Sequence, residues 1–173
     1  MRILNAGQIK AVLERFAREM IRQYGSLDQV VFIGVRTRGP YVAKRLAQLI
    51  KKRHGKEIPV GEMDITLYRD DLNALLPGGT IDHTRIPFDI ANKIVVLFDD
   101  VLHTGRTVRA AVDHLIDLGR PRMIHLAVMI DRGGRELPVA ANYVGKTIKL
   151  AASGQVQVRL KEVDRTDEVV VET

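Results

Sequence analysis

The sequence contains no cysteine. Disulfide bonds and metal sites built from thiolates are therefore excluded, and the chain is compatible with a reducing cytoplasm, where we expect it to be located. It also lacks an apolar run long enough to span a bilayer, and its first residues, MRILNAGQIKAVLERF, lack the apolar core of a signal peptide. We therefore expect no association with a membrane.

Internal repeats, linkers and low-complexity segments are absent as well. The 173 residues, 1–173, fit one domain. Such a domain buries about 70% of the surface of its unfolded chain. The basic residues are in excess, with 27 Lys and Arg against 21 Asp and Glu. This excess favours phosphates on small ligands or nucleic acid, although charge alone fits a merely basic soluble protein equally well.

Apolar residues alternate between helical and strand spacing along the chain. Asn5 and Gln8 form a capping pair at the start of the first helix. The spacing predicts helices over 6–24, 40–53 and 107–118, and strands over 29–35, 59–68, 93–100, 123–131 and 155–163. This alternation predicts an α/β fold, a mostly parallel central sheet flanked by helices, with ligands at the carboxyl ends of the strands. Residues 69–87 have no clean period and are predicted to be a functional loop.

The stretch VVLFDDVLHTGRT, residues 95–107, combines an apolar strand with two carboxylates. Asp99 and Asp100 stand at the predicted carboxyl end of that strand. They would repel a phosphate, but they can accept hydrogen bonds from the two hydroxyls of a ribose. The simpler interpretation is a strand-to-helix turn with two solvated aspartates.

The loop 103–107 that follows leads into the N-terminus of a predicted helix. Unpaired N–H groups and the helix dipole make such an end an anion site. Thr104 and Thr107 add hydroxyl donors, and Gly105 lets the backbone approach a phosphate closely. Together with the two acids, this loop predicts a ribose 5-phosphate ligand.

A second loop repeats the theme in GVRTRGPYVAKRL, residues 34–46. Thr37, Arg38 and Gly39 form a tight turn between a strand and a helix. A guanidinium and exposed N–H groups suit a diphosphate, which arginine can bind with two hydrogen bonds. The tripeptide alone is a weak signal, and it gains weight from the first loop.

A nucleoside-triphosphatase is the main alternative suggested by the acidic strand and by GKT at 145–147. The phosphate-binding loop of that class needs a glycine at position 140, where this chain has Ala140. The GKT segment also follows the acidic strand instead of opening the chain. We therefore reject this interpretation.

The motifs resemble those of known proteins. VVLFDDVLHTGRT is similar to the phosphoribosyl-diphosphate signature of type I phosphoribosyltransferases. GVRTRGPYVAKRLA, VGEMDITLYRDDL, DRGGRELPVAANYVGK and EVDRTDEV resemble the PyrR family, pyrimidine-operon attenuation proteins with uracil phosphoribosyltransferase activity. The resemblance covers about residues 5 to 172. It implies a single phosphoribosyltransferase-like domain with a mobile loop at 69–87 and a small base-binding hood at 129–138.

The resemblance also implies roles for individual residues. Asp99 and Asp100 hold the ribose hydroxyls and count, with Arg69 and Asp71 of the loop, as catalytic. The implied ligands of the 5-phosphate are His103, Thr104, Gly105, Arg106 and Thr107. The implied ligands of the diphosphate are Thr37, Arg38 and Gly39. Met129 and Asp131 belong to the segment that reads the base. Mg²⁺ bridges diphosphate and ribose without a direct protein ligand. No metal is assigned to His83, His114 or His125.

A role in RNA binding follows from the same resemblance. Arg15, Arg18 and Arg22 share a face of the first predicted helix, and Arg135 and Lys146 extend the basic surface. Spacing alone favours a solvated charged face. The PyrR family, however, binds a stem–loop of its own leader mRNA. Where that family tends to carry histidine and a basic residue, this chain has Gly134 and Ala141.

The expected function has two parts. One is transfer of the phosphoribosyl group from phosphoribosyl diphosphate to uracil, which gives UMP. The other is UMP-dependent binding of leader mRNA, which attenuates transcription of pyrimidine-biosynthesis genes. The alternative is a UMP-sensing regulator with little transferase activity; a purine transferase without an RNA role is disfavoured by ITLYRDD and DRGGRELP. The resemblance suggests a homo-oligomer, either a dimer or a tetramer.

Overall fold

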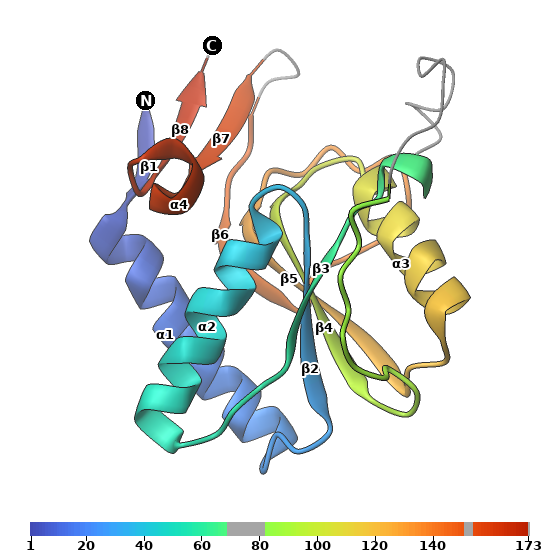
Figure 1. Cartoon of the computed structure of the whole chain (residues 1–173). Helices are drawn as coiled ribbons and strands as arrows, with labels where there is room; N and C mark the ends of the chain where they lie inside the picture. Colours follow the sequence, from blue (N-terminus) through green and yellow to red (C-terminus); the bar gives the residue numbers. More distant parts are fainter. Residues whose placement is uncertain (69–81, 151–153, 173) are drawn as a thin grey trace.

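A five-stranded parallel sheet forms the centre of the computed structural model, which describes residues 1–68, 82–150 and 154–172. Its strands, in spatial order, are β3 (Val60–Met63), β2 (Val30–Val35), β4 (Ile94–Leu102), β5 (Met123–Asp131) and β6 (Tyr143–Thr147). Helices α1 (Ala6–Tyr24) and α2 (Gly39–His54) cover one face, and α3 (Arg106–Leu118) covers the other (Figure 1). The predicted α/β fold is confirmed.

Local chemistry accounts for where the helices begin. The Asn5 side chain accepts a hydrogen bond from the Gln8 N–H and the Gln8 side chain accepts one from the Asn5 N–H, both at 2.9 Å. This capping box satisfies N–H groups that the first turn of α1 leaves without helical partners. Pro40 lies in the first turn of α2, where its missing N–H is no loss. Gly105 precedes α3 with φ +95°, a conformation that glycine adopts without strain.

The core has two apolar clusters, one on each face of the sheet. The cluster under α1 and α2 includes Phe32 and Phe98 from neighbouring strands, whose ring centroids lie 4.8 Å apart. The cluster under α3 includes Leu97 and Leu115. Because strand side chains alternate between the faces, Leu97 and Phe98 pack in opposite clusters. This packing fixes the positions of Asp99 and Asp100, which follow directly.

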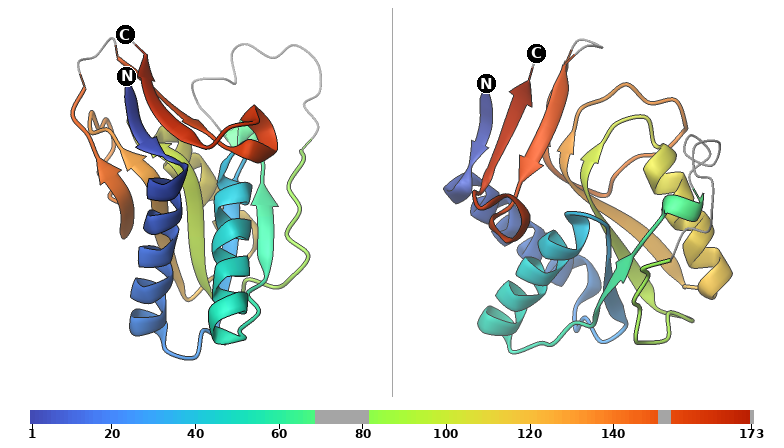
Figure 2. Two further views of the ribbon diagram at one scale, coloured as in Figure 1. Left: turned by 90° about the vertical axis from the view of Figure 1, so that its left-hand side faces the viewer. Right: turned by 45° about the horizontal axis from the view of Figure 1, so that its top comes forward.

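A second, antiparallel sheet was not predicted. It joins β1 (Arg2–Asn5), β8 (Glu168–Glu172) and β7 (Gln155–Arg159), so the two ends of the chain lie side by side (Figure 2). The strand predicted over 155–163 is wrong at its end, because Lys161–Asp164 form the short helix α4. There the Asp164 carboxylate accepts the Leu160 N–H at 2.8 Å, and this local bond turns the backbone.

The strand predicted over 59–68 is also too long. It ends at Met63, and Thr66–Tyr68 form a 3-10 turn, η1. The Asp64 carboxylate accepts hydrogen bonds from the Thr66 N–H at 3.0 Å and from its hydroxyl at 2.7 Å, which closes the turn. Of the predicted loop 69–87, residues 69–81 lie outside the described residues. Within the described ranges, no helix has the length and apolar character needed to cross a membrane.

Candidate active site

The two acids of the first motif lie at the carboxyl edge of the sheet. Asp99 and Asp100 are in the last part of β4, which continues to Leu102, two residues beyond the predicted strand. Asp99 is only 7% exposed. Its carboxylate accepts the N–H of Asp100 at 2.8 Å, and the Asp100 carboxylate accepts the N–H of Val101 at 2.8 Å. These backbone bonds orient both carboxylates before any ligand binds.

The predicted phosphate loop connects this strand to α3. The hydroxyl of Thr104 accepts the N–H of Arg106 at 3.3 Å, and Gly105 and the first turn of α3 follow. The N–H groups of this first turn, the Thr104 hydroxyl and the helix dipole make an anion site. The predicted residues of the loop are therefore brought together at the N-terminus of α3.

The loop after β5 packs on this phosphate loop. The Thr104 carbonyl accepts the N–H groups of Glu136 at 2.9 Å and Leu137 at 3.1 Å. The Arg106 guanidinium binds the Glu136 carboxylate at 2.7 Å. A Cβ at Gly105 would lie 2.4 Å from the side chain of Val139, so only glycine allows this approach. The predicted hood segment and phosphate loop are thus one packed unit.

His103 and Arg135 hold the same two segments together. The His103 Nδ1 lies 2.8 Å from the Gly133 carbonyl, and Arg135 donates to the His103 carbonyl at 2.9 Å. Arg135 also binds the Asp131 carboxylate at 2.6 Å. Burial alone would raise the pKa of Asp131, but the hydrogen bonds from Arg135 and the Gly133 N–H lower it below its ordinary value. Arg135, predicted to contact RNA, is therefore engaged within the site.

The predicted diphosphate loop packs against the strand that carries the acids. A Cβ at Gly39 would lie 2.3 Å from the Phe98 carbonyl oxygen, directly before Asp99. A Cβ at Gly34 would lie 2.2 Å from the backbone nitrogen of Pro40. The peptide bond between Arg36 and Thr37 is cis. Glycine at 34 and 39 therefore lets the second loop lie beside the first.

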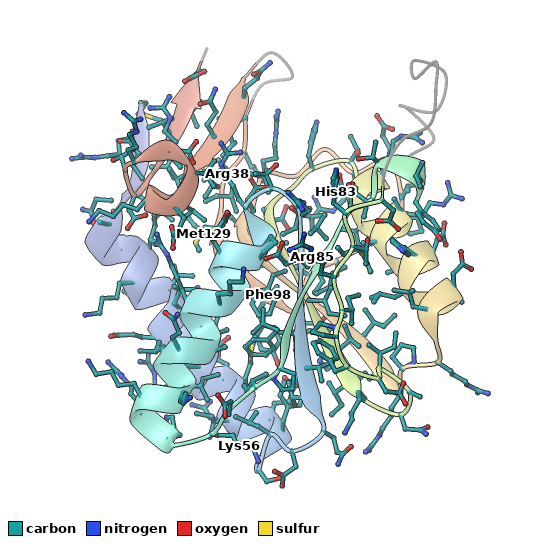
Figure 3. The ribbon with its side chains drawn as sticks, in the orientation of Figure 1. Arg38, Lys56, His83, Arg85, Phe98 and Met129 are labelled. Atoms are coloured by element: carbon teal, nitrogen blue, oxygen red, sulfur yellow. The ribbon has the colours of Figure 1, made fainter. Side chains whose placement is uncertain are left out.

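Arg38, in this second loop, already has a partner. Figure 3 labels Arg38 beside the short helix α4. The Nε and Nη2 of Arg38 donate to the two carboxylate oxygens of Asp164 in α4, at 3.1 and 2.7 Å. This hydrogen-bonded pair raises the pKa of Arg38 and lowers that of Asp164, and the negative charge of Asp100 raises the pKa of Arg38 further. Sequence reasoning missed Asp164, because EVDRTDEV carries no recognisable ligand-binding pattern of its own.

Three other predicted site residues need comment. The Met129 side chain is fully buried in the cluster under α1 and α2, so it cannot reach a ligand, and only the backbone of that residue remains as a candidate. Arg69 and Asp71 lie outside the described residues.

Arg132, which follows β5, has a buried Nε without a hydrogen-bond partner in the described part of the chain. A buried donor of this kind indicates an acceptor from a ligand or water.

The carboxylate oxygens at the carboxyl edge of the sheet fit a magnesium ion that is held mainly by a substrate. In residues 1–68, 82–150 and 154–172, no group of three or more histidine and acidic side chains could hold a metal. Asp99 and Asp100 supply carboxylate oxygens beside the predicted diphosphate loop. Mg²⁺ is typically bound by one or two carboxylates together with substrate phosphates and water.

The predicted RNA face lies along α1 and the edge strand β6. Arg18 and Arg22 are exposed, as is Lys146 of β6. Arg15 donates to the carbonyls of Val144 and Gly145, each at 2.8 Å. Its guanidinium therefore holds α1 on β6, whereas Arg18 and Arg22 are the more exposed arginines of this predicted face.

Comparison with known proteins agrees with the geometry. Residues 1–162 match the phosphoribosyl transferase domain family. The "Bifunctional protein PyrR" of Chloroflexus aurantiacus is 52% identical over 169 residues, which cover 98% of this chain and 93% of that protein. The chain belongs to the PyrR family of phosphoribosyltransferases. The PyrR protein of Thermus thermophilus is 48% identical, with 96% and 92% of the two chains covered.

Solved structures confirm the fold of this PyrR-family chain. A hypoxanthine phosphoribosyltransferase from Staphylococcus aureus has a TM-score of 0.71 at 19% identity and covers 98% of this chain and 90% of its own. The enzyme of the same name from Trypanosoma cruzi has a TM-score of 0.75 at 17% identity, covering 98% and 82%. At these identities the likeness describes the fold alone.

Proposed function

We propose that this PyrR-family chain transfers the phosphoribosyl group from phosphoribosyl diphosphate to uracil, giving UMP and diphosphate, and that it regulates pyrimidine-biosynthesis genes by UMP-dependent binding to leader mRNA. The observation that carries the proposal is one arrangement at the sheet edge. Asp99, which is buried, and the neighbouring Asp100 lie at the end of β4, between the N-terminus of α3 at Gly105 and the loop that carries Arg38, and the chain is 52% identical to a protein named bifunctional PyrR.

The acidic pair is proposed to bind the ribose. Asp99 and Asp100, held by backbone N–H groups at 2.8 Å, would accept hydrogen bonds from the 2′ and 3′ hydroxyls. Hydrogen bonds to a carboxylate are roughly twice as strong as those between neutral groups. The ribose would therefore be fixed with its anomeric carbon between the two loops.

The two loops are proposed to bind the phosphates. His103 to Thr107 would hold the 5-phosphate at the N-terminus of α3, and Thr37, Arg38 and Gly39 would hold the diphosphate. Mg²⁺ bound with the diphosphate would neutralise charge that develops on the leaving group. A monophosphate and a diphosphate at the two ends of one ribose are the features that distinguish phosphoribosyl diphosphate from other ribose ligands.

The reaction proposed is a displacement at the anomeric carbon. The bond to uracil N1 forms, the bond to the diphosphate oxygen breaks through an oxocarbenium-like state, and the N1 proton is lost. No covalent nucleophile is required, so the protein contributes positioning and electrostatics. Arg69 and Asp71 are proposed to assist. The backbone of 129–138 would read the base, with Asp131 fixed by Arg135 at 2.6 Å.

The RNA-binding half of the proposal concerns a different surface. Arg18 and Arg22 are exposed on the second half of α1, and Lys146 is exposed near the carboxyl end of β6, where it pairs with Ile130 of β5. A basic surface of this kind would neutralise phosphates of a stem–loop. The substrates and transcript imply a cytoplasmic protein, and assembly into a dimer or tetramer stays a prediction.

One assay tests the enzyme. The full chain is incubated with Mg²⁺, phosphoribosyl diphosphate and uracil, hypoxanthine or guanine separately, and nucleotide is measured. UMP formation alone is expected. Nucleotide from a purine base would contradict the base preference. Binding of UMP without any turnover would instead favour the UMP-sensing regulator.

A matched pair of variants tests the acids. Asp99→Asn with Asp100→Asn keeps the shape of the site but replaces charge-assisted hydrogen bonds, so turnover should fall while the circular dichroism spectrum stays that of the parent. Asp113→Asn, whose carboxylate pairs with Arg109 on the exposed face of α3, controls for loss of an acid outside the site. Parent-like turnover of a folded double variant would rule out the ribose assignment.

A further inference from the structure

Arg38 is held in one orientation by Asp164, a residue of the helix α4 that connects β7 and β8 of the small antiparallel sheet. Asp164 of α4 is 126 residues away in sequence, and its carboxylate binds the Nε and Nη2 of Arg38 at 3.1 and 2.7 Å. The two side chains are 30% and 18% exposed, so the pair is largely removed from water. Asp164 is itself fixed, because it also accepts the Leu160 N–H at 2.8 Å.

A separate ion-pair group anchors α4 independently of Arg38. Arg45 lies seven residues further along α2, on the same face. It donates to the carboxylate of Glu162 at 2.8 Å and to that of Asp167 at 2.7 Å. The small antiparallel sheet is therefore docked on α2 by Arg45 whether or not Arg38 has a partner. The Arg38–Asp164 pair is therefore not needed to attach α4 to α2, and it calls for another explanation.

The geometry of the pair leaves a usable edge of the guanidinium. Asp164 engages the Nε–Nη2 edge, and Nη1 forms the other fork with the second N–H of Nη2. Arginine can present such a fork to a phosphate. The loop that carries Arg38 packs against β4 at Gly39, and the carboxylate of Asp100 lies close enough to raise the pKa of Arg38. The second fork thus belongs to the loop assigned to the diphosphate.

We propose that Asp164 is a positioning residue for substrate binding: it fixes the guanidinium of Arg38 so that the opposite fork is presented to the diphosphate of phosphoribosyl diphosphate. The inference rests on the proposed function, in which Arg38 binds that diphosphate. Ordering a long, flexible side chain at a binding site costs about 0.5–1.5 kcal/mol. Asp164 has already ordered Arg38 in the unliganded chain, so the ligand does not bear that cost.

The proposal predicts a selective change in affinity. Asp164→Asn keeps one acceptor but loses the charge and the paired geometry, and inorganic diphosphate with Mg²⁺ should then bind roughly two- to tenfold more weakly in a calorimetric titration. UMP carries no diphosphate, so its affinity should stay that of the parent. Asp164→Glu, which retains a carboxylate, should lie between the parent and Asp164→Asn. Tighter diphosphate binding by Asp164→Asn would show that Asp164 competes with the ligand and would overturn the proposal.

Two further variants separate positioning from mere docking of α4. Glu162→Gln removes a partner of Arg45 from the same helix, and it should lower thermal stability while leaving diphosphate affinity unchanged. In an Arg38→Ala background, Asp164→Asn should have no further effect on diphosphate affinity, because the two residues act as one unit. Equal weakening by Glu162→Gln and Asp164→Asn, or a full additional effect in the Arg38→Ala background, would overturn the inference.

The same titrations distinguish failure of the inference from failure of the proposed function. If Arg38→Ala binds diphosphate as the parent does, the diphosphate role of Arg38 is wrong. If Arg38→Ala binds it more weakly but Asp164→Asn does not, the role of Arg38 stands and the positioning role of Asp164 is wrong.

Discussion

Gly39→Ala tests the contact that brings the two ligand loops together. The Cβ of the new side chain would lie 2.3 Å from the Phe98 carbonyl oxygen. A carbon–oxygen contact is normally no shorter than about 3.3 Å, so the loop and β4 would have to separate by about 1 Å. The carbonyl oxygen belongs to the backbone and the position of a Cβ is fixed by the backbone, so a change of rotamer cannot relieve the contact. The displaced part of β4 directly precedes Asp99.

The size of the effect follows from this shift. A displacement of about 1 Å in a positioning contact can reduce turnover on the order of 100-fold. Forcing an extra methyl into a packed region typically destabilises a protein by about 1–3 kcal/mol. For a chain of this length each kcal/mol lowers Tm by about 2–4 °C, so a drop of about 2–12 °C is expected.

The assay measures kcat/KM for UMP formation at a temperature well below both unfolding midpoints, together with denaturant unfolding. Gly7→Ala in α1 is the matched control, because its nearest new contact is an ordinary 3.4 Å to the Asn5 side chain. That change should leave activity intact and stabilise the helix by up to about 1 kcal/mol. If Gly39→Ala kept the kcat/KM and the unfolding midpoint of the parent, the reasoning about loop contact would be wrong.

Three further predictions concern other parts of the molecule. Gly134→Ala should weaken UMP binding, because its Cβ would lie 2.7 Å from the His103 ring, whereas Gly55→Ala at the end of α2, with a similar positive φ but open space, should leave UMP affinity unchanged; equal affinities in calorimetry would contradict this. Arg45 lowers the pKa of Glu162 below its ordinary value of 4.5, so the pair contributes stability at neutral pH that is lost as pH falls through the lowered pKa. The stability difference between the parent and Glu162→Gln should therefore shrink below about pH 4.5 in denaturant titrations, and a difference that persists at pH 2 would refute the linkage. Arg18→Ala with Arg22→Ala should flatten the plot of log RNA affinity against log salt by roughly one to two units in filter-binding measurements, and an unchanged slope would exclude phosphate contacts by these arginines.

Much of the fold and site could be predicted because the decisive chemistry is local. Asn5 and Gln8 cap α1 through side chains three residues apart, and apolar runs with helical or strand spacing located α1 to α3 and β2 to β5. Asp99 to Thr107 form a continuous strand–loop–helix motif, so their common location follows from the order of the residues. In a parallel sheet, strand ends meet at one edge, which also placed the loop at Thr37 to Gly39 beside them.

Tertiary structure decided whatever depends on partners far away in sequence. Periodicity showed that Met129 belongs to a buried strand, but only packing determined that its side chain enters the core under α1 and α2. Arg15 looked like a surface arginine until β6 supplied two carbonyl acceptors. The pairing of β1 with β8, and of Arg38 with Asp164, joins segments from opposite ends of the chain. Such pairs leave no periodic pattern in a single sequence, because their energy arises only when the folded backbone brings the groups within hydrogen-bonding distance.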